Sequence, residues 1–103
     1  MAAALKVLTS KQKQFLKGLA HPLAPIVRVG RGRLTESVIE ETKKSLLAHE
    51  LIKVRIESDD SAERRSIAES LASAADAAIA GSVGKIVMLY REREEKPVIK
   101  LPR

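Results

Sequence analysis

The sequence predicts a single α/β domain in which three helices pack on a mixed four-stranded sheet. Apolar residues recur at helical spacing in three segments, and two strand-like segments flank one of these helices. A further pair of strand-like segments follows near the end of the chain. A length of 103 residues suits one domain that folds without disulfides. We expect one domain over residues 1–103, with a core in residues 8–96 and a tail in residues 97–103.

Seven elements are predicted, in the order helix, strand, helix, strand, helix, strand, strand. The first two strands flank a crossover helix, so they should be close to parallel in one sheet, with a right-handed connection. Gly84 and Lys85 fit the two-residue turn of a hairpin between the last two strands. The approximate bounds, in chain order, are residues 10–20, 26–29, 36–48, 51–57, 62–75, 77–83 and 86–90.

Polar residues with short side chains mark the start of each helix. Thr9 or Ser10 can cap the first helix, and Thr35 can cap the second. Asp60 and Glu63 have the spacing of a capping box at the start of the third helix. The three predicted helices therefore have local signals for their first turns.

Positive charge is concentrated towards the ends of the chain. The net charge is +6, and residues 1–33 contain seven Lys or Arg and no acid. Residues 34–80 contain ten acids and six bases. Because charge that only aids solubility is usually mixed, this segregation suggests a polyanionic partner, most often a nucleic acid.

Residues 27–35 carry three arginines, where an apolar strand breaks into a glycine-containing loop and a helix then begins. Free backbone N–H groups, the positive end of the helix and three guanidinium groups each favour an anion such as a phosphate. Three lysines of the preceding helix extend this positive charge. The predicted binding residues are Lys11, Lys13, Lys17, Arg28, Gly30, Arg31, Gly32, Arg33 and Thr35.

Few aromatic side chains are available for stacking on bases. We expect Phe15 to lie in the core, whereas Tyr90 could either stack on a base or close the core edge. Lys53 and Arg55 lie on the polar face of their strand, and either solvent or RNA could face them. One Phe and one Tyr favour structured RNA recognised by its shape.

The sequence lacks the residues that several classes of function need. There is no Cys, and His21 and His49 are far apart, so we expect no metal site and no cofactor. Residues 81–85 superficially resemble a phosphate-binding P-loop, but Ile86 stands where Ser or Thr would bind magnesium. With no catalytic constellation, signal peptide or apolar run of about 20 residues, we expect a cytoplasmic monomer that is not an enzyme.

Separated motifs occur at residues 8–13, 19–23, 29–30, 34–35, 49–54, 84–85, 89–91 and 101–103. Together they resemble the CRM domain (chloroplast RNA splicing and ribosome maturation), in its stand-alone bacterial YhbY form. The resemblance implies an RNA-binding domain whose fold is similar to the C-terminal domain of translation initiation factor three. It also implies association with rRNA in precursors of the large ribosomal subunit.

The loop departs from the Gly-x-x-Gly pattern that the resemblance implies for RNA backbone contact. Gly30 matches the first glycine, but Arg33 occupies the fourth position and a glycine comes one place early, at Gly32. If the fourth position needs a positive φ angle, Arg33 would be strained there by about 1 kcal/mol, unless this conformation has shifted to Gly32. We therefore expect arginine side chains to take over much of the recognition.

The main hypothesis is an RNA-binding ribosome assembly factor that uses the basic loop and the first helix. Phosphate contacts should then dominate, with steep salt dependence and modest sequence selectivity. One alternative is a protein-interaction module that docks a ribosomal or splicing protein. The other is an enzyme that acts on a phosphorylated ligand, with the loop as its phosphate cradle.

Overall fold

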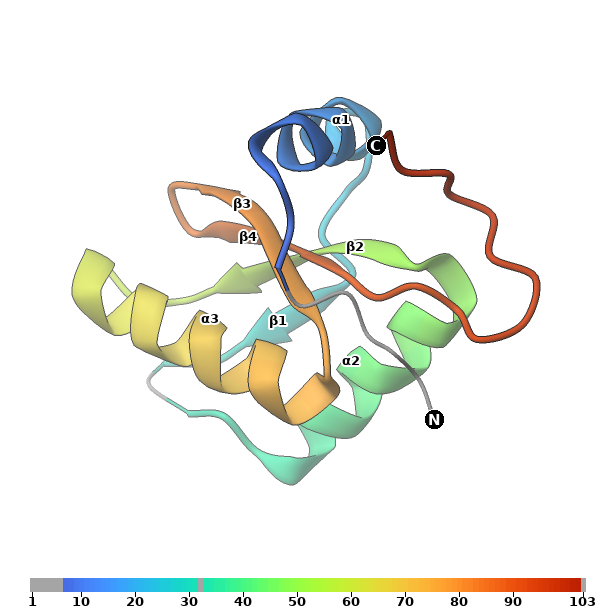
Figure 1. Cartoon of the computed structure of the whole chain (residues 1–103). Helices are drawn as coiled ribbons and strands as arrows, with labels where there is room; N and C mark the ends of the chain where they lie inside the picture. The colour runs from blue at the N-terminus through green and yellow to red at the C-terminus, as the bar shows by residue number, and fades with distance from the viewer. Residues whose placement is uncertain (1–6, 32, 103) are drawn as a thin grey trace.

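The computed structural model describes residues 7–31 and 33–102, and its elements follow the predicted order (Figure 1). The sheet has the strand order β1-β2-β4-β3, in which β1 is parallel to β2 and the other pairs are antiparallel. The predicted mixed four-stranded sheet is thus confirmed. The elements are α1 (Ser10–Ala20), β1 (Val27–Val29), α2 (Glu36–His49), β2 (Leu51–Ile56), α3 (Ser61–Ala75), β3 (Ala78–Val83) and β4 (Ile86–Tyr90).

Helices cover both faces of the sheet. Figure 1 shows α1 on one face and α2 with α3 on the other. Because successive side chains of a strand point to opposite faces, β4 contributes Val87 and Leu89 to the core under α2 and α3. It contributes Met88 and Tyr90 to a second core under α1. The sheet is therefore the shared wall of two apolar cores.

The structure corrects the prediction for Phe15 and decides between the two alternatives for Tyr90. Phe15 is 39% exposed, so the prediction that it lies in the core is wrong. Neighbouring helical residues point about 100° apart, and Leu16 is the one that faces the sheet. Tyr90 is 1% exposed and closes the core under α1, which excludes the alternative of base stacking. Burial, with smaller effects of nearby acids, raises the pKa of Tyr90 to about 12.

A buried glutamate fixes the path of the chain after β4. Glu50, in the turn between α2 and β2, is 1% exposed and has a φ of 64°. Its carboxylate accepts hydrogen bonds from the backbone N–H groups of Arg93, Val98 and Ile99 at 2.8 to 2.9 Å. Its carbonyl oxygen accepts another from the N–H of Arg91 at 2.8 Å. One residue thus ties the segment after β4 to the end of α2.

The C-terminal tail, described to residue 102, continues from Glu50 to α1 (Figure 1). Ile99 and Leu101 pack against the core under α1. The side-chain amide of Gln12 donates a hydrogen bond to the carbonyl oxygen of Pro102 at 3.1 Å. Gln12 also completes a capping box with Thr9, which confirms Thr9 as the cap of α1. The tail is therefore part of the layer that contains α1.

Replacing Glu50 by Gln is expected to destabilise the fold by about 1 to 3 kcal/mol, because an amide nitrogen would face backbone donors that now reach a carboxylate. Urea unfolding of the two proteins measures this difference. Glu41→Gln, an exposed change on α2, is the matched control and should shift the free energy of unfolding by less than about 0.5 kcal/mol. Equal stabilities for Glu50→Gln and the control would contradict the role of Glu50.

The same carboxylate predicts a pH dependence of stability. Burial opposes its ionisation, but the three N–H donors and the charge of Arg93 outweigh burial and hold the pKa of Glu50 below its usual value of 4.5. A lowered folded-state pKa stabilises the fold above the unfolded-state pKa, and this stabilisation is lost as pH falls through the folded-state value. Unfolding free energies measured from pH 7 to about pH 3 should therefore fall below about pH 4.5. The fall should be smaller in Glu50→Gln, and equal slopes would contradict this assignment.

Candidate nucleic-acid interface

The basic loop leaves β1 as a tight turn. The N–H of Arg33 donates a hydrogen bond to the carbonyl oxygen of Gly30 at 3.1 Å. The Thr35 hydroxyl accepts a hydrogen bond from the N–H of Val38 at 3.2 Å, which confirms Thr35 as the cap of α2. Arg31 and Arg33 are both exposed. The turn therefore presents arginine side chains to solvent immediately before a helix N-terminus.

Gly30 has no structural need to be glycine. Its φ is outside the left-handed region, and a Cβ added there would have no neighbour within 4 Å among the atoms described. The lack of a side chain instead leaves the backbone open to close approach. Gly32 lies outside the residues that the structure describes, and so does the predicted shift of a positive φ angle to that glycine.

Three connections meet at the same end of the sheet. Parallel pairing of β1 and β2 brings their C-terminal ends together, and the N–H of Glu57 donates to the carbonyl oxygen of Val29 at 3.0 Å. The β3–β4 turn joins them, because the N–H of Ile56 donates to the carbonyl oxygen of Lys85 at 2.7 Å. The basic loop, the β2–α3 connection and the hairpin turn thus form one surface, which we call the loop end.

The strand register places a second arginine beside the predicted one. Arg28 pairs in register with Arg55, and both lie on the α1 side of the sheet because Val27, Val29 and Val54 point into the core under α2 and α3. Both reach Glu57, whose Oε2 lies 2.8 Å from Nε of Arg55 and 3.4 Å from Nε of Arg28. The hydrogen bond from Arg55 is the main reason that the pKa of Glu57 is lowered. Arg28 still has 71% of its side chain exposed, so it remains open to a ligand.

Lys53, on the same strand face, has a structural contact. Its ammonium group donates hydrogen bonds to the carbonyl oxygens of His21 and Leu23 at 3.3 and 3.0 Å. These carbonyls belong to the chain that leaves α1, where His21 is the C-cap. Lys53 therefore anchors the end of α1 to β2, a role distinct from both readings that the sequence left open.

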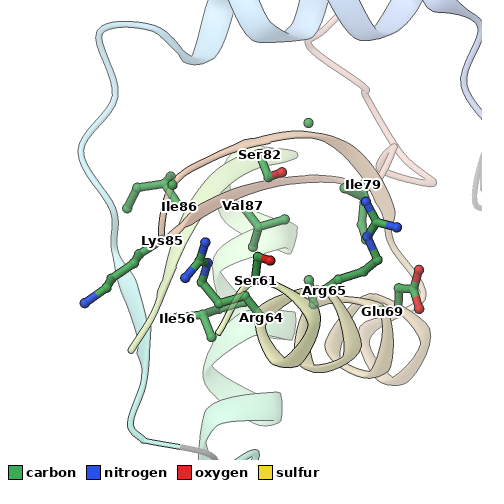
Figure 2. A pocket seen from close by; sticks show the side chains of 13 residues that line it. Ile56, Ser61, Arg64, Arg65, Glu69, Ile79, Ser82, Lys85, Ile86 and Val87 are labelled. Atoms are coloured by element: carbon green, nitrogen blue, oxygen red, sulfur yellow. The ribbon is translucent and has the colours of Figure 1, made fainter. Parts of the chain in front are cut away.

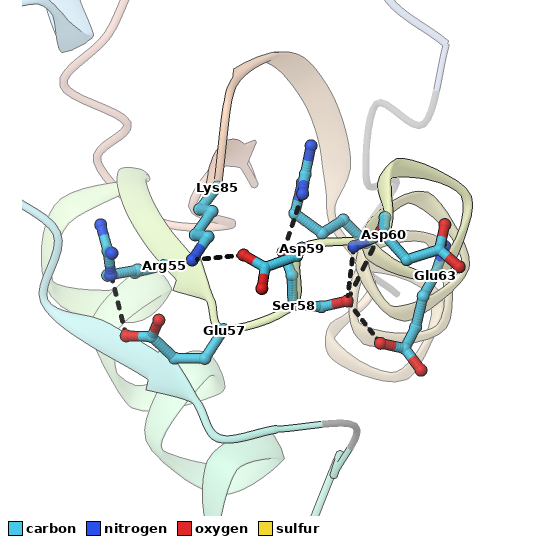
Figure 3. A network of polar contacts seen from close by, with 8 residues as sticks. Arg55, Glu57, Ser58, Asp59, Asp60, Glu63 and Lys85 are labelled. Atoms are coloured by element: carbon cyan, nitrogen blue, oxygen red, sulfur yellow. Dashed lines mark hydrogen bonds and ion pairs between the residues drawn. The ribbon is translucent and has the colours of Figure 1, made fainter.

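A lysine in the hairpin turn faces the acids of the β2–α3 connection (Figure 3). Lys85 Nζ lies 3.0 Å from Oδ1 of Asp59. The hydrogen bond and the charge of Lys85 lower the pKa of Asp59, and Arg31 and Arg64 contribute smaller charge effects. Asp59 is highly exposed, so this pair can separate when a stronger anion arrives.

The start of α3 differs in detail from the predicted capping box. The Asp60 carboxylate does accept hydrogen bonds from the N–H groups of Ala62 and Glu63, at 2.9 and 3.3 Å. The Glu63 carboxylate, however, accepts from the Ser58 hydroxyl (Figure 3), and that hydroxyl in turn accepts from the N–H of Asp60. Ser58 therefore takes the place that Glu63 has in a capping box.

The predicted lysines of α1 form a second group at the other edge of the sheet. Lys17 lies over β3, and a Cβ added to Gly81 would collide with Cε of Lys17. Lys13 lines a hollow that also includes Glu69 of α3. Lys11 is exposed on the same helix. Because β1 and β3 are the two edge strands, the structure brings the arginines together at β1 and these lysines near β3.

One row of side chains crosses the sheet between the two groups. The register aligns Arg28 of β1, Arg55 of β2, Ile86 of β4 and Val83 of β3. Val83 is exposed and Ile86 is half-buried. The face between the arginines and the lysines is therefore accessible, with positive charge on the β1 side and apolar side chains on the β3 side.

A family model of the CRS1/YhbY (CRM) domain matches residues 8–91 of this chain. The chain belongs to this family. An RNA-binding protein of Haemophilus influenzae is 43% identical over 99 residues, which cover 96% of this chain and 99% of that protein. A Bacillus subtilis protein named as a candidate RNA-binding protein is 35% identical, with 93% and 100% covered. The solution structure of a Staphylococcus aureus protein, also described as a candidate RNA-binding protein, is similar with a TM-score of 0.83 and 34% identity, covering 93% of this chain and all of that one.

In this CRM domain, sequence reasoning missed two cations of the loop end and left a third undecided. The sequence indicates Lys85 only as a turn residue, and Arg64 is not among the predicted binding residues. Arg64 donates a hydrogen bond through Nη1 to the carbonyl oxygen of Ser58 at 2.7 Å, which holds it beside the loop end. For Arg55, the sequence does not decide whether solvent or RNA faces the side chain. Gly84 and Lys85 indicate a hairpin turn in the sequence. The position of this turn beside the basic loop, however, depends on the strand order.

Across residues 7–31 and 33–102, no group of three or more His, Asp or Glu side chains is arranged to hold a metal ion. No helix within those ranges combines the length and the apolar character needed to cross a membrane.

Lys85→Ala is expected to raise the pKa of Asp59 towards its usual value of 3.8, because the substitution removes both the hydrogen bond and the nearest charge. An NMR titration of the side-chain carboxyl groups measures this pKa. Lys44→Ala, on the exposed surface of α2, removes a positive charge elsewhere and should leave the Asp59 titration unchanged. An unshifted Asp59 in Lys85→Ala would show that the pair does not form in solution.

Proposed function

We propose that this CRM domain is a cytoplasmic, non-enzymatic RNA-binding protein that assists assembly of the large ribosomal subunit. In this proposal the loop end binds the phosphate backbone of rRNA in large-subunit precursors. The observation that carries the proposal is the convergence of Arg28, Arg31 and Arg33 with two further cations, Arg55 and Lys85, at one end of the sheet. Relatives named as RNA-binding proteins support the choice of RNA as the polyanion.

Phosphate binding suits the contacts at the loop end. Exposed ion pairs contribute little to stability, so Glu57 and Asp59 can release Arg28 and Lys85 to a phosphate at small cost. Guanidinium groups then bind phosphate oxygens in a forked, charge-assisted geometry. The open backbone at Gly30 allows a phosphate to approach closely. We infer that RNA phosphates compete with the carboxylates of Glu57 and Asp59 for the same cations.

Recognition by shape fits the side chains that surround this surface. Tyr90 is buried and Phe15 lies on α1, so neither aromatic ring belongs to the loop end. Structured RNA is commonly read through its backbone and groove geometry when stacking surfaces are few. The lysines of α1 lie near β3, across the accessible part of the sheet from the arginines. They would then bind a more distant phosphate of the same RNA.

Changing Arg28, Arg31 and Arg33 together to Ala is expected to weaken binding to large-subunit precursor particles at least about tenfold near 0.1 M salt. The slope of log affinity against log salt should also become shallower by about 2, since three phosphate contacts are lost. Cosedimentation of the purified protein with ribosomal particles across a salt series measures both quantities.

A triple variant of Lys43, Lys44 and Lys100 to Ala removes the same charge elsewhere and serves as the matched control. It should keep most of the affinity. Unchanged binding of the arginine variant would contradict the assignment of the loop end. Changing Lys11, Lys13 and Lys17 in the same assay tests the part contributed by α1. Equal association with mature subunits would contradict an assembly role, and no association with RNA would favour a protein partner.

A further inference from the structure

A hollow of about 400 Å³ lies between α3 and the β3–β4 hairpin. Its apolar wall is formed by Ile56 of β2, Ile79 of β3 and Val87 of β4. Figure 2 shows Arg64 and Arg65 extending from α3 on the opposite side of this space. The volume falls within the range of small-ligand sites, which combine apolar walls with a few polar groups.

The rim of the hollow has the polar groups of a site for an anionic, flat ligand. Arg64, Arg65 and Lys85 bring three positive charges to the lining and Glu69 brings one negative charge, while the Lys85 ammonium also pairs with Asp59 outside the lining. Ser82 adds a hydroxyl from the hairpin, where Figure 2 shows it close to the strands that carry the apolar wall. Phosphate alone would not use the apolar wall, and an uncharged apolar ligand would not need the cations. A nucleotide uses both.

The hollow is connected to the loop end. Lys85 lines this hollow and also the polar hollow that contains Arg31 and Asp59. Arg64 lines the first and donates its hydrogen bond to Ser58, which lines the second. A phosphate held between Arg31 and Lys85 is therefore next to the entrance of the apolar hollow.

We propose that this hollow receives one unstacked base of the RNA whose backbone the loop end binds, an inference that rests on the proposed function. The apolar wall covers one face of the base, and the guanidinium plane of Arg65 stacks on the other. The Ser82 hydroxyl can donate to or accept from the base edge, and the Glu69 carboxylate can accept from an exocyclic amino group. The partner is thus a paired RNA with a bulged or looped-out nucleotide next to the bound backbone.

The test compares three RNA hairpins of equal stem sequence: one with a single bulged adenosine, one with an abasic site at the bulge, and one fully paired. The native protein should bind the adenosine bulge at least about tenfold more tightly than the abasic bulge, because one base–protein stack is gained. Fluorescence anisotropy with labelled RNA measures the three affinities.

Two substitutions in the hollow separate the contribution of base binding to affinity from that of backbone binding. Ser82→Tyr fills the hollow with a side chain that suits an exposed strand position. Arg65→Ala removes the stacking group from an exposed helix position and covers the case in which Ser82→Tyr does not fold. Each should bring the adenosine bulge to the affinity of the abasic bulge. Ser82→Tyr should leave the affinity for the paired hairpin unchanged, whereas Arg65→Ala, which also removes a charge, should weaken binding of the paired and abasic hairpins by the same factor. Ser70→Tyr, exposed on α3 and outside the lining of the hollow, is the matched control and should keep the difference.

The outcomes distinguish this inference from the function on which it rests. Equal affinity of the native protein for the adenosine and abasic bulges would overturn the base site, while RNA binding that depends on Arg28, Arg31 and Arg33 would still stand. A preference for the adenosine bulge that survives in Ser82→Tyr and Arg65→Ala would also overturn it. Absence of binding to all three hairpins and to precursor particles would overturn both proposals.

Discussion

The parallel pairing of β1 with β2 determines where the charged groups of this domain meet. It requires α2 to cross over the sheet, so both strands finish at the same end. The antiparallel β4 then begins at that end, and its turn places Lys85 beside the β2–α3 connection. Cations that are far apart in the sequence therefore share one surface. A different strand order would leave the arginine loop without the hairpin.

Acidic residues are the second condition for this surface. Several cations at one sheet end repel each other, and Glu57 and Asp59 offset that repulsion in the free protein. Both carboxyl groups are ionised at neutral pH, and the neighbouring cations lower their pKa values further. Because Arg28 and Asp59 are highly exposed, water and salt keep the Arg28–Glu57 and Lys85–Asp59 pairs weak. The loop end is thus held in place by interactions that a polyanion can replace.

The sequence was most informative where the determining interactions are local. Thr9 and Thr35 cap helices through contacts within three residues; the sequence predicts Thr35 and leaves Thr9 as one of two candidates, with Ser10. Glu50 could not be identified in this way, because its partners lie more than 40 residues along the chain. The position of Lys85 likewise depends on the strand order. Phe15 was misplaced because periodicity indicates an apolar side of a helix but not how much of it the sheet covers.

The packing of the C-terminal tail against the core under α1 limits the order in which the domain can form during synthesis. Helix α1 is made first, yet it packs mainly on β3 and its core is completed by Ile99 and Leu101. The layer of α2 and α3 has its apolar partners in β1 to β4 and does not wait for the tail. A nascent chain to which Ile99 and Leu101 have not yet been added therefore leaves the core under α1 incompletely covered, and this side of the sheet closes only after the tail has been made.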